Sequence, residues 1–408
     1  PQAALVPVAT GIALHKKINK RQGIVVSFIG EGTLGEGALY ESFNLASLYK
    51  VAQLIVCENN FYSQSTPQID GVAGNILDRP RAFGIKTFEA DTWDVTNLID
   101  VAKKAIEYVR QGNPAFLIIK TYRLNAHSKG DDNREKNELD FFNSKDVLNL
   151  LLLDEYWKNV AKEISLKIET HISNTPEKFL QYDGYAKDQL PRKTSARLKD
   201  VQNPKIRMVQ ALNQAYKKTL LEGSFHIGED IADPYGGAFK VTKGLSTDFP
   251  NHVRNAPISE AGFVGVATGM ALMGTKSFAE IMFGDFIVNA IDQIVNNASK
   301  FFHMYAKQQS ANVTIRTPMG GGRGYGPTHS QSLEKLLLGI DNVAVFAVSS
   351  VIQPDDLVSF VSKLECPSIL IESKIDYGAT LFQSNSLTSI DANIIGGPGG
   401  TAIFSPRA

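Results

Sequence analysis

The sequence has few cysteines, no excess of either charge and no long apolar run. Two cysteines in 408 residues cannot form a disulfide framework, and both Cys57 and Cys366 lie in or beside apolar runs typical of buried strands, so we expect inert core residues. Basic and acidic residues each number 42, so the charge balance favours neither nucleic acid nor an anionic membrane as a partner. With no membrane-length segment and no signal-peptide pattern, we expect a cytoplasmic location, or an organelle matrix in a eukaryote.

The hydrophobic pattern predicts an α/β fold. Residues 24–29 (IVVSFI), 53–57 and 116–120 are short apolar runs typical of buried parallel strands, and residues 38–49 have the period of a helix with one apolar face. Strands that alternate with helices predict a doubly wound parallel sheet, because the crossovers between parallel strands are right-handed.

Composition divides the chain into four parts. We expect a first α/β domain over residues 1–150, followed by a helical segment with an exposed linker over residues 151–204. A second α/β domain is expected over residues 205–349, and the start of a third over residues 350–408. In the second domain we expect a helix over residues 207–221 and strands over 276–282 and 313–316.

Both ends of the chain are expected to be cut. The chain opens at Pro1 without a methionine, and residues 11–16 have the pattern of the end of an amphipathic helix. It stops at Ala408, just after the strand-like residues 401–404. The first and third domains are therefore expected to be truncated.

A glycine-rich turn after the first strand has two interpretations. Residues 30–35 fit G-x-G-x-x-G, and Glu58 lies near the end of the next strand, which is the fingerprint of a nicotinamide dinucleotide site. That pattern alone is weak. In the second interpretation, the Glu31 carboxylate and an amide oxygen from Asn59-Asn60 share one hard cation at the carboxyl edge of the sheet.

The second interpretation matches a known motif. Gly30-Glu31-Gly32 followed by Asn59-Asn60 resembles the thiamine diphosphate motif GDG…NN. The resemblance implies that Gly30 and Gly32 lie against the diphosphate, and that Glu31, Asn60 and the Tyr62 carbonyl bind Mg²⁺. Glu31 departs from the aspartate usual in the family, which puts full activity in doubt.

Two polar loops each follow a strand and contain a histidine. Residues 121–134 read TYRLNAHSKGDDNR, and residues 316–331 read RTPMGGGRGYGPTHSQ, whose glycines suit a backbone held close to a ligand. The first loop resembles the YRxxGHS loop of alpha subunits of 2-oxo acid dehydrogenase E1 components. By that resemblance His127 faces cofactor and substrate, and Ser128, Asp131 and Asp132 belong to a mobile loop, with Ser128 near the cofactor. In the beta subunits, the counterpart of His329 approaches the thiazolium.

One acid lies among small and apolar residues. Glu260 opens a helical pattern within residues 256–265 (APISEAGFVG), where burial favours a protonated carboxyl. A glutamate at a helix N-terminus is the plainer explanation, since the helix dipole favours an acid there. By resemblance, Glu260 is the glutamate that activates the aminopyrimidine, and Phe286 is the aromatic residue that packs against it.

The motifs PISEAGF, EIMFGDF, AIDQIVNNASK and RTPMGGGRGYGPTHSQS follow GEDIADPYGGAFKVTKGLS in the order of E1 beta subunits. The chain thus resembles alpha-type and beta-type E1 regions fused together. This implies the thiamine-diphosphate-binding fold, thiamine diphosphate with Mg²⁺ as cofactors, and oxidative decarboxylation of a 2-oxo acid. It also implies a lipoyl domain of an E2 acyltransferase as the acyl acceptor, and a homodimer.

Three alternatives remain open. One is another thiamine-dependent enzyme such as an acetoin-cleaving dehydrogenase, and a second is a catalytically idle E1-like subunit. The third is the nicotinamide-dependent oxidoreductase, which accounts for the glycine turn and for none of the other motifs.

Overall fold

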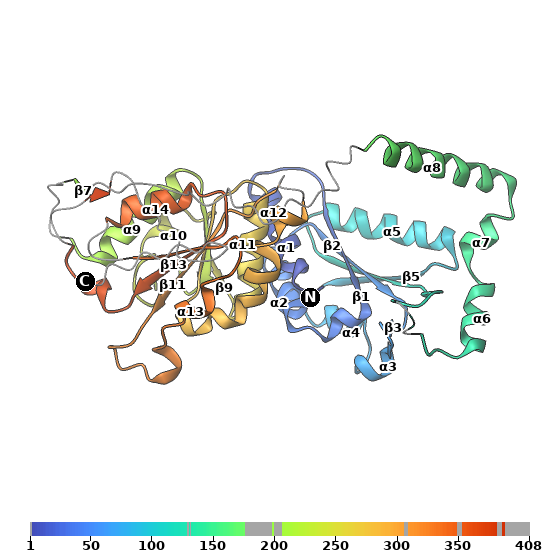
Figure 1. The fold of residues 1–408 in the computed structure, drawn as a ribbon, viewed down its shortest axis with the longest axis horizontal. Coiled ribbons are helices and arrows are strands. Elements are labelled where there is room, and N and C mark those ends of the chain that lie inside the picture. Colours follow the sequence, from blue (N-terminus) through green and yellow to red (C-terminus); the bar gives the residue numbers. More distant parts are fainter. Residues whose placement is uncertain are drawn as a thin grey trace.

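The computed structural model describes residues 2–128, 130, 132–175, 206–305, 309–348 and 353–381, and the backbone of the short strands β7 (Leu198–Lys199) and β14 (Ser386–Leu387). Two α/β units lie side by side, and the N-terminus lies between them (Figure 1). The expectations for Asp131 and for residues 382–408 fall outside the described residues, except for the backbone of β14.

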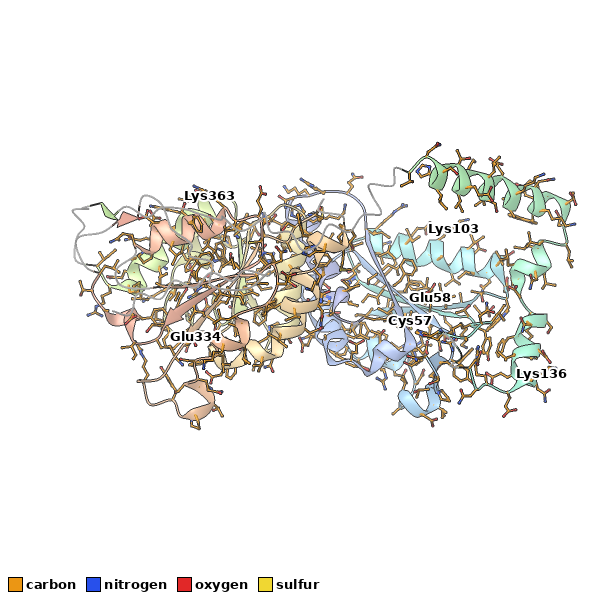
Figure 2. All side chains as sticks on the ribbon, viewed as in Figure 1. Cys57, Glu58, Lys103, Lys136, Glu334 and Lys363 are labelled. Carbon is orange, nitrogen blue, oxygen red and sulfur yellow. The ribbon has the colours of Figure 1, made fainter. Side chains whose placement is uncertain are left out.

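The first unit is built on a four-stranded parallel sheet in the order β1-β2-β6-β5. Its strands are β1 (Val25–Gly30), β2 (Gln53–Asn59), β6 (Ala115–Lys120) and β5 (Lys86–Asp91). Side chains of β2 alternate between the faces: Leu54 packs beneath helix α5 (Val95–Arg110), and Ile55 packs beneath α2 (Gly37–Tyr49). Cys57 lies on the α2 side, inside the side chains that fill this unit (Figure 2).

The second unit has a six-stranded parallel sheet in the order β12-β13-β11-β10-β8-β9. The strands are β8 (Phe225–Glu229), β9 (Val253–Ala256), β10 (Ser277–Glu280), β11 (Val313–Met319), β12 (Ala344–Ala347) and β13 (Ser368–Ser373). Helix α11 (Glu260–Leu272) covers one face, and α9 (Met208–Leu221) with α14 (Pro354–Ser362) covers the other. Both faces are buried, as in other parallel sheets.

The remaining elements connect or flank these layers. The helices are α1 (Leu5–Ile18), α3 (Gln68–Gly71), α4 (Asp78–Arg81), α6 (Lys136–Ser144), α7 (Val147–Leu151), α8 (Glu155–Ser173), α10 (Leu245–Asp248), α12 (Phe301–Met304) and α13 (Glu334–Leu337). The hairpin strands are β3 (Tyr62–Ser63) and β4 (Thr66–Pro67). The 3₁₀-helices are η1 (Glu31–Gly35), η3 (Gly284–Ala290), η5 (Pro327–His329) and η6 (Asp376–Gly378), and η4 (Gln293–Ala298) is a π-helix. None of the helices in this part of the chain is long and apolar enough to span a membrane.

Helices α1 and α11 join the two units by crossing backbone against backbone. A Cβ atom on Gly11 would lie 2.1 Å from the Val266 carbonyl oxygen, and one on Gly269 would lie 2.0 Å from the Val8 carbonyl oxygen. No side chain fits between the two helices at these positions, so the crossing requires glycine on both sides. The short interhelical distance also buries Leu14 in the core of the second unit.

The predicted α/β class and most of the predicted elements are confirmed, with three corrections. Strand β5 was missed, since this edge strand is half exposed and mostly polar. Helix α1 is buried on nearly all sides, so the predicted amphipathic character is wrong. The predicted boundary at residue 349 is also wrong, because β13 lies within the second sheet and α14 packs on α9. Residues 353–381 therefore belong to the second unit instead of opening a third domain.

We predict that Gly11→Ala destabilises the chain by about 2–3 kcal/mol, because its methyl group forces the two helix backbones apart. The measurement is the free energy of unfolding from urea titration. Gly37→Ala is the control, because the space beside Gly37 is open. Equal stability of both variants would contradict the close crossing.

Candidate active site

The Glu31 carboxylate lies buried beneath the glycine turn. Its Oε2 accepts a hydrogen bond from the Asn60 backbone N–H at 3.2 Å, and its Oε1 is buried without a hydrogen-bond partner. A Cβ on Gly32 would meet Ser63 Oγ at 2.3 Å, so only glycine lets the turn close over the hairpin of β3 and β4. A buried carboxylate oxygen with no partner is suited to a cation ligand.

The asparagine pair shapes the opposite side of this turn. Asn60 Oδ1 accepts the Tyr62 backbone N–H at 3.0 Å, and Asn59 Oδ1 accepts the Phe61 N–H at 3.1 Å. The structure therefore brings Glu31, Asn60 and Tyr62 together, and their role as Mg²⁺ ligands stays a prediction. Among the described residues, no group of three or more His, Cys, Asp or Glu side chains could hold a metal, and the predicted ligand set contains one carboxylate.

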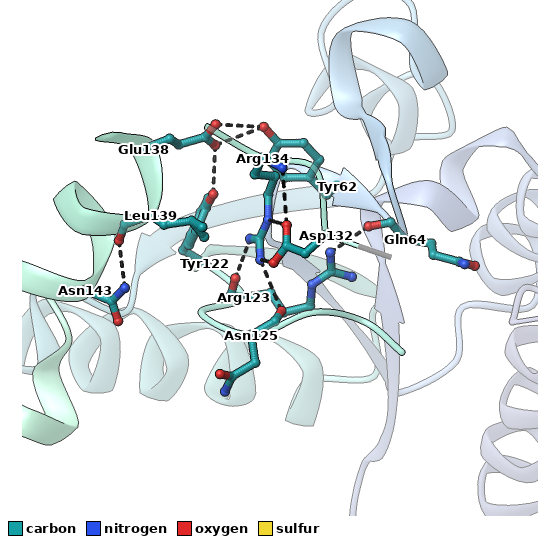
Figure 3. A network of polar contacts seen from close by, with 10 residues as sticks. All are labelled: Tyr62, Gln64, Tyr122, Arg123, Asn125, Asp132, Arg134, Glu138, Leu139 and Asn143. Atoms are coloured by element: carbon teal, nitrogen blue, oxygen red, sulfur yellow. Dashed lines mark hydrogen bonds and ion pairs between the residues drawn. The ribbon is translucent and has the colours of Figure 1, made fainter. Parts of the chain in front are cut away.

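The loop after β6 is held by Arg134, which lies against the rings of Tyr62 and Tyr122 (Figure 3). Its guanidinium pairs with Asp132, at 2.6 Å between Nη2 and Oδ2, and donates to the carbonyl oxygens of Arg123 and Asn125. The hydrogen bond from Arg134 lowers the pKa of Asp132 to about 2.

Both tyrosine hydroxyls donate to one carboxylate on the neighbouring helix. Tyr62 and Tyr122 reach Glu138 of α6 at 2.9 Å and 2.8 Å. Above this framework, His127 and Ser128 lie in an exposed loop, and His127 Nδ1 is 3.0 Å from Ser128 Oγ. The framework thus fixes the base of the loop and leaves its histidine accessible.

Glu260 opens helix α11 and is buried, with 7% of its surface exposed. Its position agrees with the plainer explanation of an acid favoured at a helix N-terminus, and its burial is the property that the second explanation requires. Glu41 of α2 lies beside it and accepts the Gly262 backbone N–H at 2.7 Å. Burial raises the pKa of Glu41, and the negative charge of Glu260 adds to this effect.

A third acid, the buried Glu229 at the end of β8, completes the group. Burial, followed by the negative charges of Glu260 and Asp230, raises the pKa of Glu229 to about 7. Its Oε1 is buried without a hydrogen-bond partner. We name Glu41, Glu229 and Glu260 the acid cluster. Burial and the negative charge of Glu260 both act to raise the pKa of Glu41 and of Glu229.

His329 packs among aromatic rings. Its imidazole stands edge-on to Phe283 and Phe286, with ring centroids 4.9 Å and 5.2 Å away. Thr328 Oγ1 lies 2.9 Å from His329 Nδ1. Two of the predicted residues, His329 and Phe286, are therefore in contact.

The predicted residues thus form groups around Glu31, around Glu260 and around His329. Within the residues that the structure describes, no hydrogen bond joins the turn at Glu31 to Glu260 or His329. Sequence reasoning missed Glu41 and Glu229 in particular. The signal for Glu41 was weak, since it follows the helical pattern of α2 and its partner lies 221 residues away.

Two family models match the chain. The family described as Dehydrogenase E1 component matches residues 1–173, and the family described as Transketolase, pyrimidine binding domain matches residues 204–380. These two regions coincide with the two α/β units. The second match also crosses residue 349, in agreement with the sheet.

Similar proteins of known name fall into alpha-type and beta-type subunits. A pyruvate dehydrogenase E1 component subunit alpha from Rickettsia bellii is 32% identical over 184 residues, covering 44% of this chain and 56% of the relative. An acetoin:2,6-dichlorophenolindophenol oxidoreductase subunit beta from Bacillus subtilis is 33% identical, covering 42% and 54%. A mitochondrial pyruvate dehydrogenase E1 component subunit beta from Chaetomium thermophilum is 34% identical, covering 45% and 48%. The chain spans about half the length of each.

We predict that Glu229→Gln changes the pH dependence of stability. A carboxyl with a higher pKa in the folded chain than in the unfolded chain binds its proton more tightly in the folded chain. Its contribution to the free energy of unfolding is therefore present below pH 4.5 and is lost as the pH rises through about 7. Between about pH 5 and pH 8, the wild type should lose about 2–3 kcal/mol relative to the variant. Urea unfolding at several pH values measures this, and parallel curves for the two proteins would refute it.

A second prediction concerns the loop. Arg134→Lys should speed amide hydrogen exchange of residues 123–128 at least about tenfold, because lysine cannot make the forked contacts of a guanidinium. Mass spectrometry of peptides from this loop measures the exchange. Lys136→Met, on the exposed start of α6, is the control and should leave the exchange unchanged.

Proposed function

We propose that this chain is a thiamine-diphosphate-dependent E1 component that catalyses oxidative decarboxylation of a 2-oxo acid, because one region matches the Dehydrogenase E1 component and the other matches the Transketolase, pyrimidine binding domain. The acyl group would pass to a lipoyl domain of an E2 acyltransferase. The observation that carries the proposal is the buried Glu260 at the start of α11, set beside Glu41 and Glu229.

The residues at the glycine turn fit the expected cofactor and its metal. Glu31 has a buried oxygen free of hydrogen bonds, and Asn60 lies beside it with an amide oxygen. In the proposal these two residues, with the Tyr62 carbonyl, hold Mg²⁺, and the turn at Gly30 and Gly32 holds the diphosphate. When bound, thiamine diphosphate supplies a carbon nucleophile and an electron sink for loss of CO₂.

Glu260 would hold a proton for the aminopyrimidine ring, against which Phe286 would pack. For this role, a glutamate must keep a proton near neutral pH without being neutralised by a lysine or arginine. The acid cluster sets two further carboxyls beside Glu260, since Glu41 accepts the Gly262 backbone N–H and the pKa of the buried Glu229 is raised to about 7.

His127 and His329 would handle protons and stabilise developing charge near the substrate. His329 is suited to this because its ring is oriented by Phe283 and Phe286, while part of it stays open to solvent. His127 lies on an exposed loop with a fixed base, with Ser128 next to it, so it can meet a substrate that enters from solvent.

We further propose that the working form is a homodimer. The glycine turn lies on the first unit of the chain, and the His329 loop lies on the second. Active sites of this kind are formed between one unit of each type. A second copy of the chain would supply whichever half is too distant within one copy.

Acetoin cleavage is the second candidate, because one of the similar beta-type subunits is named for acetoin oxidation. An idle E1-like subunit is a third, suggested by Glu31 in place of aspartate. The nicotinamide alternative is the weakest, since Glu31 occupies the variable second position of that fingerprint and is here buried, and since a tight turn separates the glycines from α2.

The proposal predicts that thiamine diphosphate with Mg²⁺ binds to the chain, as measured by calorimetry. Glu260→Gln should still bind, and should lose at least about 100-fold in decarboxylation with an artificial electron acceptor, because the proton donor is gone. Pyruvate, branched 2-oxo acids and acetoin would be compared as substrates.

The outcomes separate the alternatives. Turnover of acetoin alone would favour the second candidate, and binding without turnover of any substrate would favour the idle subunit. Binding of NAD with no binding of thiamine diphosphate would overturn the proposal.

A further inference from the structure

A buried lysine holds the backbone of the loop that contains His329. Lys374 follows strand β13 directly, and none of its surface is exposed. Its ammonium group donates a hydrogen bond to the His329 carbonyl oxygen and lies over the rings of Phe283 and Tyr325, at 5.2 Å and 5.9 Å from their centroids. Burial of an ammonium group costs free energy, and the hydrogen bond and the two ring contacts offset this cost. These contacts therefore fix the position of the Lys374 ammonium group.

A buried carboxylate anchors the same loop two residues further on. Asp285 Oδ1 accepts the Gln331 backbone N–H at 3.2 Å and the Gln331 side-chain amide at 2.9 Å. Asp285 precedes Phe286 in η3, so the residue that holds the loop is adjacent to a ring that packs on His329. The charge of Asp285 also favours the ammonium form of Lys374, against the effect of burial.

The rest of this loop is open to solvent. Residues 322–328 are exposed, and the loop closes at its neck through a hydrogen bond from Gly320 N–H to the Gln331 carbonyl. His329 is partly buried between the exposed residues and the neck. Its backbone therefore depends on contacts with residues outside the loop.

We propose that Lys374 and Asp285 are positioning residues that together fix the backbone of His329 and so set its imidazole against Phe283 and Phe286. Lys374 holds the carbonyl of His329, and Asp285 holds the amide of Gln331, so opposite charges hold the loop at two points. The catalytic consequence of this inference rests on the proposed function, and the positioning itself does not.

The test is NMR of the protein labelled with ¹³C at its seven histidines, with the His329 signal assigned by its loss in His329→Asn. Lys374→Met keeps the length of the side chain and removes the donor. The His329 signal should shift and broaden in this variant, because the carbonyl loses its partner and the ring leaves the shielding region of the two phenylalanines. Lys374→Arg, which keeps a cationic donor, should restore part of the original signal.

Two controls keep the result interpretable. Lys335→Met removes an exposed lysine close in sequence and should leave the His329 signal unchanged. If Lys374→Met does not fold, Asp285→Leu, which removes the acceptor oxygens, takes its place, and the same shift and broadening are expected. An unchanged His329 signal in the folded Lys374→Met, or in Asp285→Leu where it takes that place, would overturn the inference.

An activity measurement then distinguishes the inference from the proposed function. Lys374→Met should bind thiamine diphosphate within about twofold of the wild type and lose at least about tenfold in kcat for decarboxylation. If the wild type itself shows no decarboxylation, the proposed function fails, and the NMR result still decides the positioning. A variant with a displaced His329 signal and full kcat would refute the catalytic part of the inference alone.

Discussion

The contact between helices α1 and α11 is the constraint on which the rest of the arrangement depends. Glycine on both helices lets the backbones touch, and this close approach brings α2 of the first unit over the start of α11 in the second. Glu41 can then reach the Gly262 N–H and lie beside Glu260. The acid cluster is thus a product of the interface between the units. Neither unit alone would bring these three carboxyls together.

A second buried charge group makes the carboxyl edge of the second sheet rigid. Arg316 of β11 pairs with Glu372 of β13 at 2.6 Å and with Glu280 of β10, and two tyrosine hydroxyls complete the shell of Glu372. Burial raises the pKa of Glu280, although the charge of Arg316 opposes this effect. Such a group gives little net stability, and it ties three neighbouring strands in one register. Lys374 leaves the sheet two residues after Glu372, so the anchor of the His329 loop starts from this fixed edge.

The elements that could be predicted from the sequence are those with a clear local hydrophobic pattern. Strands β1, β2 and β6 are apolar runs, and α2 and α9 have clear helical periods, so these elements lie close to the predicted residues. Strand β5 was missed because an edge strand needs few apolar side chains. The boundary at residue 349 was misplaced because nothing local distinguishes a strand that closes one sheet from a strand that begins another. Sheet membership is decided by pairing between distant segments.

The same limit applies to the site. Glu260 could be found, since a lone carboxylate among small and apolar residues is unusual, and Glu31 could be found between its glycines. Glu41, Glu229 and Lys374 look ordinary in their local sequence, and their importance comes from contacts across 221 residues in one case and 45 in another. The residues proposed to carry chemistry are marked by local composition, because they break the pattern around them. The residues that tune or position them obey the local pattern, so only the three-dimensional structure reveals them.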